Sequence, residues 1–364
     1  MKVFKWYYCV TFLVVFSHGL TCFAAFKTTN LFIEGRDSYS ILMAHRPNLE
    51  GYPNGHFGMY ELNVGIKTNG SKLWHQLYHE PNIGLSFFYT NVGNNKYTGS
   101  TAATFAFIQF PYVRFKKSQF NFKLALGPGW VEKKFDRLSN YKNLVTGTHL
   151  NAAIQLTQSY QVQLTPKQHL SVGVCLTHFS NGSYRLPNLG INLAGLQVGY
   201  HYRFKDTKKP LLDTIKFKRK MNYVISYSCG LKQVYPVLSK QYFLSNFSAI
   251  IYNRFKEKAS FGLLLDLFKD ESVNNQMKFD TDSTNNNKTN LQAGLGAVYE
   301  ISIDRFTIPL AAGFYVYNNY KVLPSMYLKF ALNYYITEQI HISFNLKSHY
   351  AKADYFSYGL GYRF

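Results

Sequence analysis

Hydrophobic and polar residues alternate with a period of two along most of the chain. In the final run, every second position is aromatic or aliphatic: Phe356, Tyr358, Leu360, Tyr362 and Phe364. The positions between them are small or polar: Ser357, Gly359, Gly361 and Arg363. Because successive side chains of a strand point to opposite faces, this pattern predicts a β-strand with one apolar face.

Sixteen runs of this kind predict strands, at residues 37–46, 58–67, 82–92, 101–115, 119–131, 150–164, 168–180, 190–204, 221–233, 241–254, 259–269, 289–301, 305–318, 325–336, 340–349 and 354–364. Tight polar turns alternate with long connections such as 131–149 and 270–288. Such strands, with short turns at one end and long loops at the other, are typical of transmembrane β-barrels. Residues 68–81 are an exception, because they form a long stretch where a short turn is expected.

The chain also contains an internal repeat. The segment from Gln168 to Phe204 resembles the segment from Gln339 to Phe364, and both end in Gly-Tyr followed by Arg-Phe within a few residues. We interpret residues 25–204 and 221–364 as two barrel halves joined by a basic linker, 205–220. The predicted fold is all-β, an antiparallel outer-membrane barrel of about sixteen strands. The alternative is an eight-stranded barrel followed by a second, degenerate barrel-like half.

The N-terminal residues have the features of a secretory signal peptide. Lys2 and Lys5 precede an apolar run, and the segment ends in small residues at Ala24 and Ala25. The apolar run is too short for a membrane span, so we expect cleavage after Ala24 and residues 1–24 to be absent from the mature protein. Together with a final strand that ends in Phe364, this predicts a multi-pass barrel in the bacterial outer membrane.

Composition and charge narrow the class of protein further. A mean hydropathy of −0.18 argues against a bundle of transmembrane helices, and 46% hydrophobic residues argue against disorder. Aromatic residues make up 18% of the chain, which suits strands. The net charge of +21 suggests an anionic partner. Because no nucleic-acid motif accompanies the charge and the protein is predicted to be exported, we expect anionic lipid and no nucleic acid.

Three polar residues lie on faces that should contact lipid. His178 and Ser180 share the parity of the apolar residues Leu170, Val172, Val174 and Leu176. Asn192 shares the apolar parity of the next strand. Side chains at i and i+2 of a strand lie on one face, so His178 can accept the proton of the Ser180 hydroxyl while Asn192 orients the imidazole. The structural alternative is a set of polar residues at the membrane interface.

The turn after Ser180 suits a developing oxyanion. Asn181 offers a side-chain amide, and the backbone N–H groups near Ser183 are further donors. We therefore predict catalytic roles for Ser180, His178 and Asn192, and supporting roles for Asn181, Ser183 and Asn188.

This segment resembles the lipid A 3-O-deacylases of the PagL type, which are outer-membrane acyloxyacyl hydrolases. The similarity is carried by His178, Ser180, Asn181, Pro187, Asn188, Gly190 and Ile191. The resemblance implies that Ser180 is the nucleophile, that His178 is the general base, and that Asn181 with the N–H near Ser183 forms the oxyanion hole. The family's acid, however, falls on Asn192. A neutral amide fixes the imidazole tautomer but stabilises imidazolium less, so slower turnover is expected.

The same spacing is also similar to outer-membrane phospholipase A, which depends on calcium. The substrate is accordingly predicted to be lipopolysaccharide, with phospholipid as the alternative. No cofactor and no metal site are predicted, apart from calcium under the phospholipase interpretation. An alternative of another class is a barrel without activity, such as a channel or adhesin with a relic site. The number of subunits is left open.

Two further sets of residues complete the predictions. Lys133, Lys134 and Arg137 lie in a predicted outer loop, where they either meet lipopolysaccharide phosphates or are ordinary solvated charges. In the second half, Ala351 stands where a serine would be, and His349 falls on the parity that faces the lumen. We interpret this segment as a degenerate copy of the site.

Overall fold

The fold is given by a computed structural model, which describes residues 30–44, 49, 55–92, 96–205, 217–280, 289–320, 322–350 and 352–364. The predicted signal peptide, most of the predicted linker and Ala351 lie outside the described residues.

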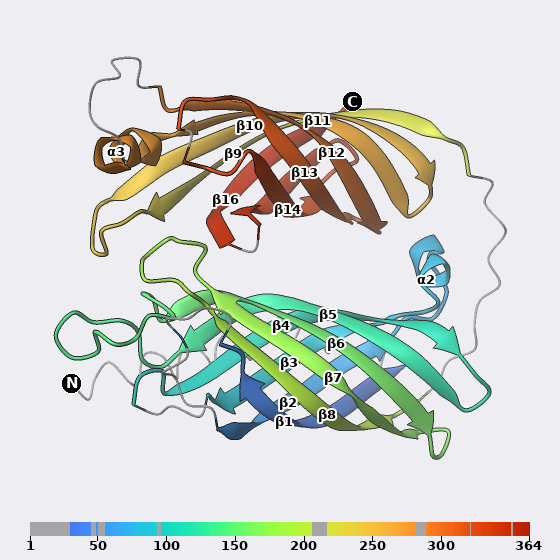
Figure 1. Cartoon of the computed structure of the whole chain (residues 1–364). Coiled ribbons are helices and arrows are strands. Elements are labelled where there is room, and N and C mark those ends of the chain that lie inside the picture. The colour runs from blue at the N-terminus through green and yellow to red at the C-terminus, as the bar shows by residue number, and fades with distance from the viewer. Residues whose placement is uncertain are drawn as a thin grey trace, which may run out of the picture.

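The first eight strands form a closed antiparallel barrel, the N-terminal barrel (Figure 1). They are β1 (Leu31–Leu42), β2 (His56–Lys67), β3 (Asn82–Asn91), β4 (Ser100–Arg114), β5 (Ser118–Val131), β6 (Leu150–Gln163), β7 (Gln168–Ser180) and β8 (Ile191–Arg203). Each strand pairs with its sequence neighbour, and β8 closes the barrel by pairing with β1. At this closure Asp37 lies opposite Val198 and Tyr39 opposite Leu196.

The other eight strands form a second closed barrel, the C-terminal barrel. They are β9 (Lys220–Gln233), β10 (Gln241–Lys256), β11 (Ala259–Asp270), β12 (Leu291–Ile303), β13 (Phe306–Asn318), β14 (Met326–Tyr335), β15 (Ile340–His349) and β16 (Lys352–Arg363). Here β16 closes on β9.

The all-β class and the sixteen strands in the described part of the chain are therefore confirmed. The expectation of one large barrel is corrected, because the strands close as two barrels of eight, which was the alternative interpretation. The physical reason is that β8 satisfies its free edge with β1, so it offers no edge to β9.

The two faces of the strands differ as the alternation predicts. On β7, Leu170, Val172, Val174 and Leu176 are exposed on the outer wall, whereas Ser171, Cys175 and Thr177 are buried in the lumen. The final strand shows the same pattern, with exposed Tyr358, Leu360 and Tyr362. An apolar outer wall on a closed barrel is suited to lipid, as in β-barrels that span a membrane. In the described part of the chain, no helix is both long and apolar enough to cross a membrane.

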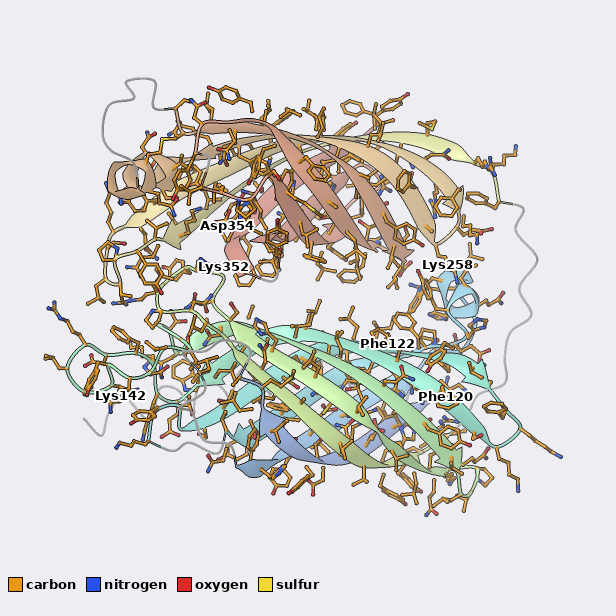
Figure 2. The ribbon with its side chains drawn as sticks, in the orientation of Figure 1. Phe120, Phe122, Lys142, Lys258, Lys352 and Asp354 are labelled. Carbon is orange, nitrogen blue, oxygen red and sulfur yellow. The ribbon has the colours of Figure 1, made fainter. Side chains whose placement is uncertain are left out.

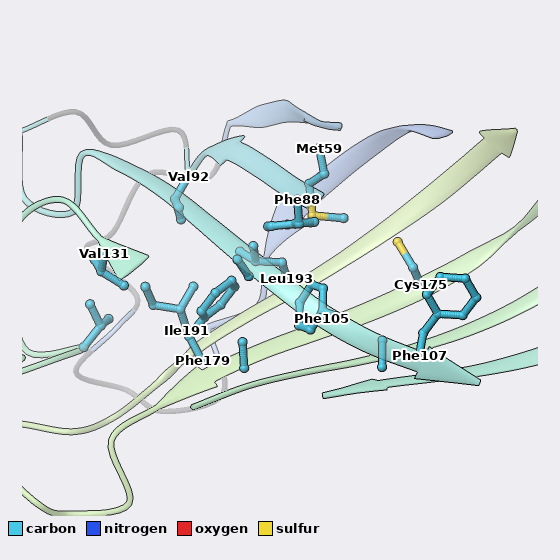
Figure 3. Close-up of a cluster of buried hydrophobic side chains, with 14 of the residues drawn as sticks. Met59, Phe88, Val92, Phe105, Phe107, Val131, Cys175, Phe179, Ile191 and Leu193 are labelled. Carbon is cyan, nitrogen blue, oxygen red and sulfur yellow. The ribbon is translucent and has the colours of Figure 1, made fainter. Parts of the chain in front are cut away.

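The interior of the N-terminal barrel has two layers. Towards the end with the long loops, an apolar cluster includes Met59, Phe88, Phe105 and Phe179 (Figure 3). Nearer the middle of the strands, a buried charged network fills the lumen, and Lys123 Nζ lies 2.6 Å from Glu61 Oε1. Polar side chains from the neighbouring strands complete this network.

The C-terminal barrel is also filled by paired charges. Lys232 Nζ lies 2.6 Å from Asp270 Oδ2, and Lys329 Nζ lies 2.6 Å from Asp266 Oδ1. As predicted, His349 lies on the inside, where its Nε2 is 2.9 Å from the Tyr315 hydroxyl. The register between β15 and β16 shifts beside Lys347 and Ser348, where Asp354 is an extra residue on β16, so the alternation of β15 continues unbroken to His349.

The two barrels touch at the end that carries the tight turns. The unexpected long stretch 68–81 contains a short helix, α2 (Leu73–Leu77). Directly after it, the Tyr78 hydroxyl donates a hydrogen bond to the Ser302 carbonyl (2.9 Å), and Lys258 lies over the Tyr78 ring. Figure 2 shows Lys258 beside this helix. Burial raises the pKa of Tyr78 to about 12, so its hydroxyl keeps the proton that it donates.

The barrels touch again at the opposite end, where the long loops lie. The β7–β8 loop, residues 181–190, rises from the N-terminal barrel towards the C-terminal barrel (Figure 1). There it forms hydrogen bonds with Gln233 at the end of β9 and with Ala353 at the start of β16. A second helix, α3 (Glu271–Asp280), lies at this end in the connection between β11 and β12.

Candidate active site

The apolar core of the N-terminal barrel fixes which side chains face outwards at the ends of β7 and β8. Phe179 and Ile191 are each 1% exposed and point into the core (Figure 3). Because the strand period is two, the residues that flank them, His178, Ser180 and Asn192, project to the outer wall. His178 and Asn192 are direct cross-strand partners. Burial of large apolar residues on the inside therefore holds the three polar residues on the lipid side.

His178 and Asn192 form a short hydrogen bond. The distance between His178 Nδ1 and Asn192 Oδ1 is 2.5 Å. An amide oxygen can only accept, so Nδ1 carries the proton and donates it, and the neutral ring then has its acceptor at Nε2. Gly190 packs closely against the ring, since a Cβ at this position would lie 2.8 Å from His178 Cε1. The orientation of the imidazole is thus fixed by a hydrogen bond on one side and by backbone on another.

Ser180 is 5% exposed, and its hydroxyl lies among hydrogen-bonding groups of the β7–β8 loop. Asn188 Nδ2 donates to Ser180 Oγ at 2.9 Å, and the Gly182 N–H donates to it at 3.1 Å. Asn188 Oδ1 accepts from the Asn181 N–H at 3.0 Å and from the Ser180 hydroxyl at 3.3 Å, so both the oxygen and the NH₂ group of this amide contact Ser180. Two N–H donors therefore converge on Ser180 Oγ.

Asn181 has a different position from the one expected of an oxyanion donor. Its side-chain amide donates to Thr148 Oγ1 at 3.1 Å and to the Arg185 carbonyl at 2.8 Å. Both donors of the amide are therefore engaged within the loops. In this structure Asn188, rather than the Asn181 side chain, contacts Ser180.

The turn after Ser180 has an unusual backbone. Gly182 and Ser183 have φ values of 59° and 60°, and the Tyr184 N–H donates to the Asn181 carbonyl. Two successive residues with positive φ turn the chain sharply, and at Ser183 this conformation is strained for a residue with a Cβ. The turn directs the Gly182 N–H back towards Ser180.

The β5–β6 loop, residues 132–149, supports the β7–β8 loop from one side. The Leu189 and Gly190 N–H groups donate to the carbonyls of Leu144 and Val145. Gly147 lies so close that a Cβ would be 2.7 Å from the Leu186 carbonyl oxygen. The same loop carries the predicted basic residues, of which Lys133 and Arg137 are exposed and Lys134 is half-buried.

The C-terminal barrel supports the β7–β8 loop from the other side. The Leu186 N–H donates to Gln233 Oε1 at 2.6 Å, and the Gln233 N–H donates to the Ser183 carbonyl at 2.8 Å. The Ser183 hydroxyl donates to the Ala353 carbonyl at 3.2 Å. The Phe356 ring occupies the space that a side chain at Gly182 would need.

Sequence reasoning missed Thr148, Gln233 and Phe356. Each contacts the loop from a distant part of the chain, 33 residues away for Thr148 and 47 for Gln233. None of the three residues belongs to the motif around Ser180, so no local signal in the sequence identifies them. Among the described residues, no group of three or more His, Cys, Asp or Glu side chains could hold a metal ion.

Fold and site together define a class: membrane-embedded β-barrels that carry Ser, His and Asn side chains on the outer wall at one rim. Residues 58–201 match the family model for lipid A 3-O-deacylase (PagL), and residues 221–364 match that for the acyloxyacyl hydrolase C-terminal domain. The chain belongs to the lipid A 3-O-deacylase family, and the two matches correspond to its two barrels. This confirms the resemblance drawn from the motif around Ser180.

Comparisons with individual proteins are weaker. No curated protein sequence matches the chain. The crystal structure of Neisserial surface protein A is 9% identical, with a TM-score of 0.33 over 48% of this chain and 98% of that one. A mutant porin of Rh. blastica is 8% identical, with a TM-score of 0.19 over 92% and 99% of the two chains. The Pseudomonas putida toluene transporter TodX is also 8% identical, with a TM-score of 0.18 over 92% and 88%. These likenesses carry no argument about activity.

Proposed function

We propose that the protein is a serine-type hydrolase of the outer membrane that removes an ester-linked acyl chain from lipid A of lipopolysaccharide. Family membership supports hydrolysis of acyl esters. The observation that carries the serine mechanism is the 2.5 Å hydrogen bond between His178 and Asn192 on the face that also bears Ser180. This face is the outer wall, where the acyl esters of a membrane lipid lie.

In the proposed mechanism, Ser180 Oγ attacks the ester carbonyl carbon while His178 Nε2 takes the hydroxyl proton. The tetrahedral intermediate collapses, the bond to the sugar oxygen breaks, and His178 returns the proton to that oxygen. Water then attacks the acyl-enzyme with His178 again as base. Fatty acid leaves, and the Ser180 hydroxyl is restored.

The proposed oxyanion donors are the Gly182 N–H and the Asn188 amide. Both already donate to Ser180 Oγ, at 3.1 and 2.9 Å, so they lie beside the atom to which the carbonyl carbon becomes bonded. Donors that are fixed before the reaction stabilise negative charge without reorganisation. Asn181 acts indirectly in this proposal, because its backbone N–H orients Asn188 and its side chain joins the two loops.

Lys133, Lys134 and Arg137 are proposed contacts for the phosphates of lipid A. They lie in the β5–β6 loop, which is hydrogen-bonded to the β7–β8 loop through Leu144 and Val145. Positive charge at this rim would hold an anionic headgroup next to the wall that bears the site.

The test is Ser180→Ala. We expect release of fatty acid from lipid A to fall by a factor of at least about 10³, as expected for loss of a catalytic nucleophile. Release is measured by mass spectrometry of lipid A after incubation with purified protein. Ser325→Ala is the matched control, since Ser325 is an exposed serine in the β13–β14 connection, and it should keep full activity. Undiminished release by Ser180→Ala would refute the serine mechanism.

The same assay separates the two lipid substrates. Phospholipid vesicles replace lipid A in one arm, and a chelator of calcium is added in another. Under our proposal lipid A is the better substrate and the chelator leaves its hydrolysis unchanged. Hydrolysis of phospholipid that stops with the chelator would instead identify a calcium-dependent phospholipase.

A further inference from the structure

The C-terminal barrel contacts the site although it carries no copy of Ser180 among its described residues. Its contacts converge on one short segment, the turn from Gly182 to Leu186. This segment supplies the Gly182 N–H that donates to Ser180 Oγ. The position of that donor therefore depends on what holds the turn.

Gln233, the last residue of β9, makes the most extensive of these contacts. It is 5% exposed and contacts the turn at two points, accepting from the Leu186 N–H and donating its own N–H to the Ser183 carbonyl. The side-chain amide also donates to the Ser239 carbonyl. With its NH₂ group engaged there, the amide oxygen is directed to Leu186.

Phe356 of β16 holds the same turn by packing. Its ring lies against Gly182, where no side chain would fit, and it packs against Phe344 with ring centres 5.0 Å apart and the ring planes tilted by 38°. Ser183 has a strained backbone with φ of 60°, and a strained turn keeps its shape only where its surroundings impose it. Gln233 and Phe356 provide such surroundings.

We infer that Gln233 and Phe356 are positioning residues for the proposed hydrolysis, through which the C-terminal barrel holds the Gly182 N–H in line with Ser180. This inference rests on the proposed function. It gives the C-terminal barrel a role in the reaction of the N-terminal barrel, because without these contacts the turn keeps, among the described residues, only the hydrogen bonds to Ala353 and Gln241 on that side.

The experiment measures kcat and KM for deacylation of lipid A by Gln233→Ala and Gln233→Glu. Gln233→Ala should lower kcat by roughly ten- to a hundredfold with little change in KM, since small misplacement of a catalytic group has effects of this size. Gln233→Glu keeps an oxygen for the Leu186 N–H and should recover most of the activity. Gln339→Ala is the control and should keep wild-type kcat, because Gln339 is an exposed glutamine in the β14–β15 turn, at the opposite end of the C-terminal barrel.

A second measurement does not depend on turnover. The rate at which a fluorophosphonate probe labels Ser180 should fall in Gln233→Ala and in Phe356→Leu, and hydrogen exchange in residues 181–190 should rise while β7 stays protected. Because Phe356→Leu keeps an apolar side chain, it tests the inference even if Gln233→Ala fails to assemble.

The possible failures can be told apart. If Ser180→Ala still hydrolyses lipid A and the probe labels another residue, the proposed function itself fails. If Ser180→Ala is inactive while Gln233→Ala and Phe356→Leu keep wild-type kcat and labelling rates, only the inference is overturned.

Discussion

At the scale of single residues, Asn192 sets the chemistry of the proposed site. Its amide oxygen holds His178 Nδ1–H at 2.5 Å and thereby fixes the tautomer that a general base needs. In the proposed mechanism the imidazole becomes positively charged in the transition state. A carboxylate would stabilise that charge, whereas a neutral amide only orients the ring.

Two different substitutions of Asn192 are therefore predicted to have different effects on kcat. Asn192→Asp keeps the side-chain length and adds a negative charge, and we expect kcat to be retained or to rise by up to about tenfold. Asn192→Leu removes the acceptor and should lower kcat by about a hundredfold or more. Steady-state deacylation of lipid A measures both. A drop in Asn192→Asp as large as that in Asn192→Leu would contradict this role for Asn192.

At the scale of elements, strand alternation places each side chain on lipid or lumen. Strand β1 follows this rule, with Ile33, Tyr39 and Ile41 exposed on the outer wall. Asp37 shares their parity and is also exposed, opposite Tyr60 on β2 and Val198 on β8. A carboxylate at mid-strand on a lipid-facing wall is unfavourable for stability.

Replacing Asp37 with leucine is accordingly predicted to stabilise the N-terminal barrel in lipid by roughly 1–2 kcal/mol. The midpoint of urea unfolding in phospholipid vesicles measures this effect. Tyr39→Leu serves as the control, since it exchanges one apolar residue for another on the same face and should have a smaller effect. Destabilisation by Asp37→Leu would mean that Asp37 makes a favourable contact in the membrane.

At the scale of the whole molecule, both lumens are filled. Buried ion pairs such as Lys123–Glu61 and Lys232–Asp270 lie inside the two barrels, at 2.6 Å each. The cavity beside Lys329 and Asn246 in the C-terminal barrel has a volume of only about 40 Å³. A closed barrel of eight strands is just wide enough for side chains to fill. These interiors do not favour the alternative of a channel.

Purified protein in a planar lipid bilayer is therefore predicted to show no steady ion conductance. Discrete conductance steps that persist at neutral pH and moderate salt would contradict the packed interiors described above. A Lys123→Ala variant provides a comparison, because it removes the central cation of the N-terminal lumen network.

Much of this architecture follows from local patterns. The run Leu170, Val172, Val174 and Leu176 predicts both the strand and its lipid-facing side, since a period of two admits only one arrangement. Most strand bounds agree within one or two residues. The first strand differs most, because it begins at Leu31 rather than at residue 37. The early part of this strand contains Glu34 and Arg36, and two charged residues so close together do not suggest a buried face. In the structure both side chains point into the lumen and form an ion pair with each other.

The sequence by itself determined the sixteen strands, their faces, and the outward position of His178, Ser180 and Asn192, because alternation is a property of neighbouring residues. Only the tertiary structure decided that the strands close as two barrels, since closure depends on whether β8 pairs with β1 or β9. It also decided that Asn188 rather than the Asn181 side chain faces Ser180, and that Gln233 contacts the turn beside it. These contacts join residues distant in sequence, and their geometry is set by the packing of loops and barrels against each other.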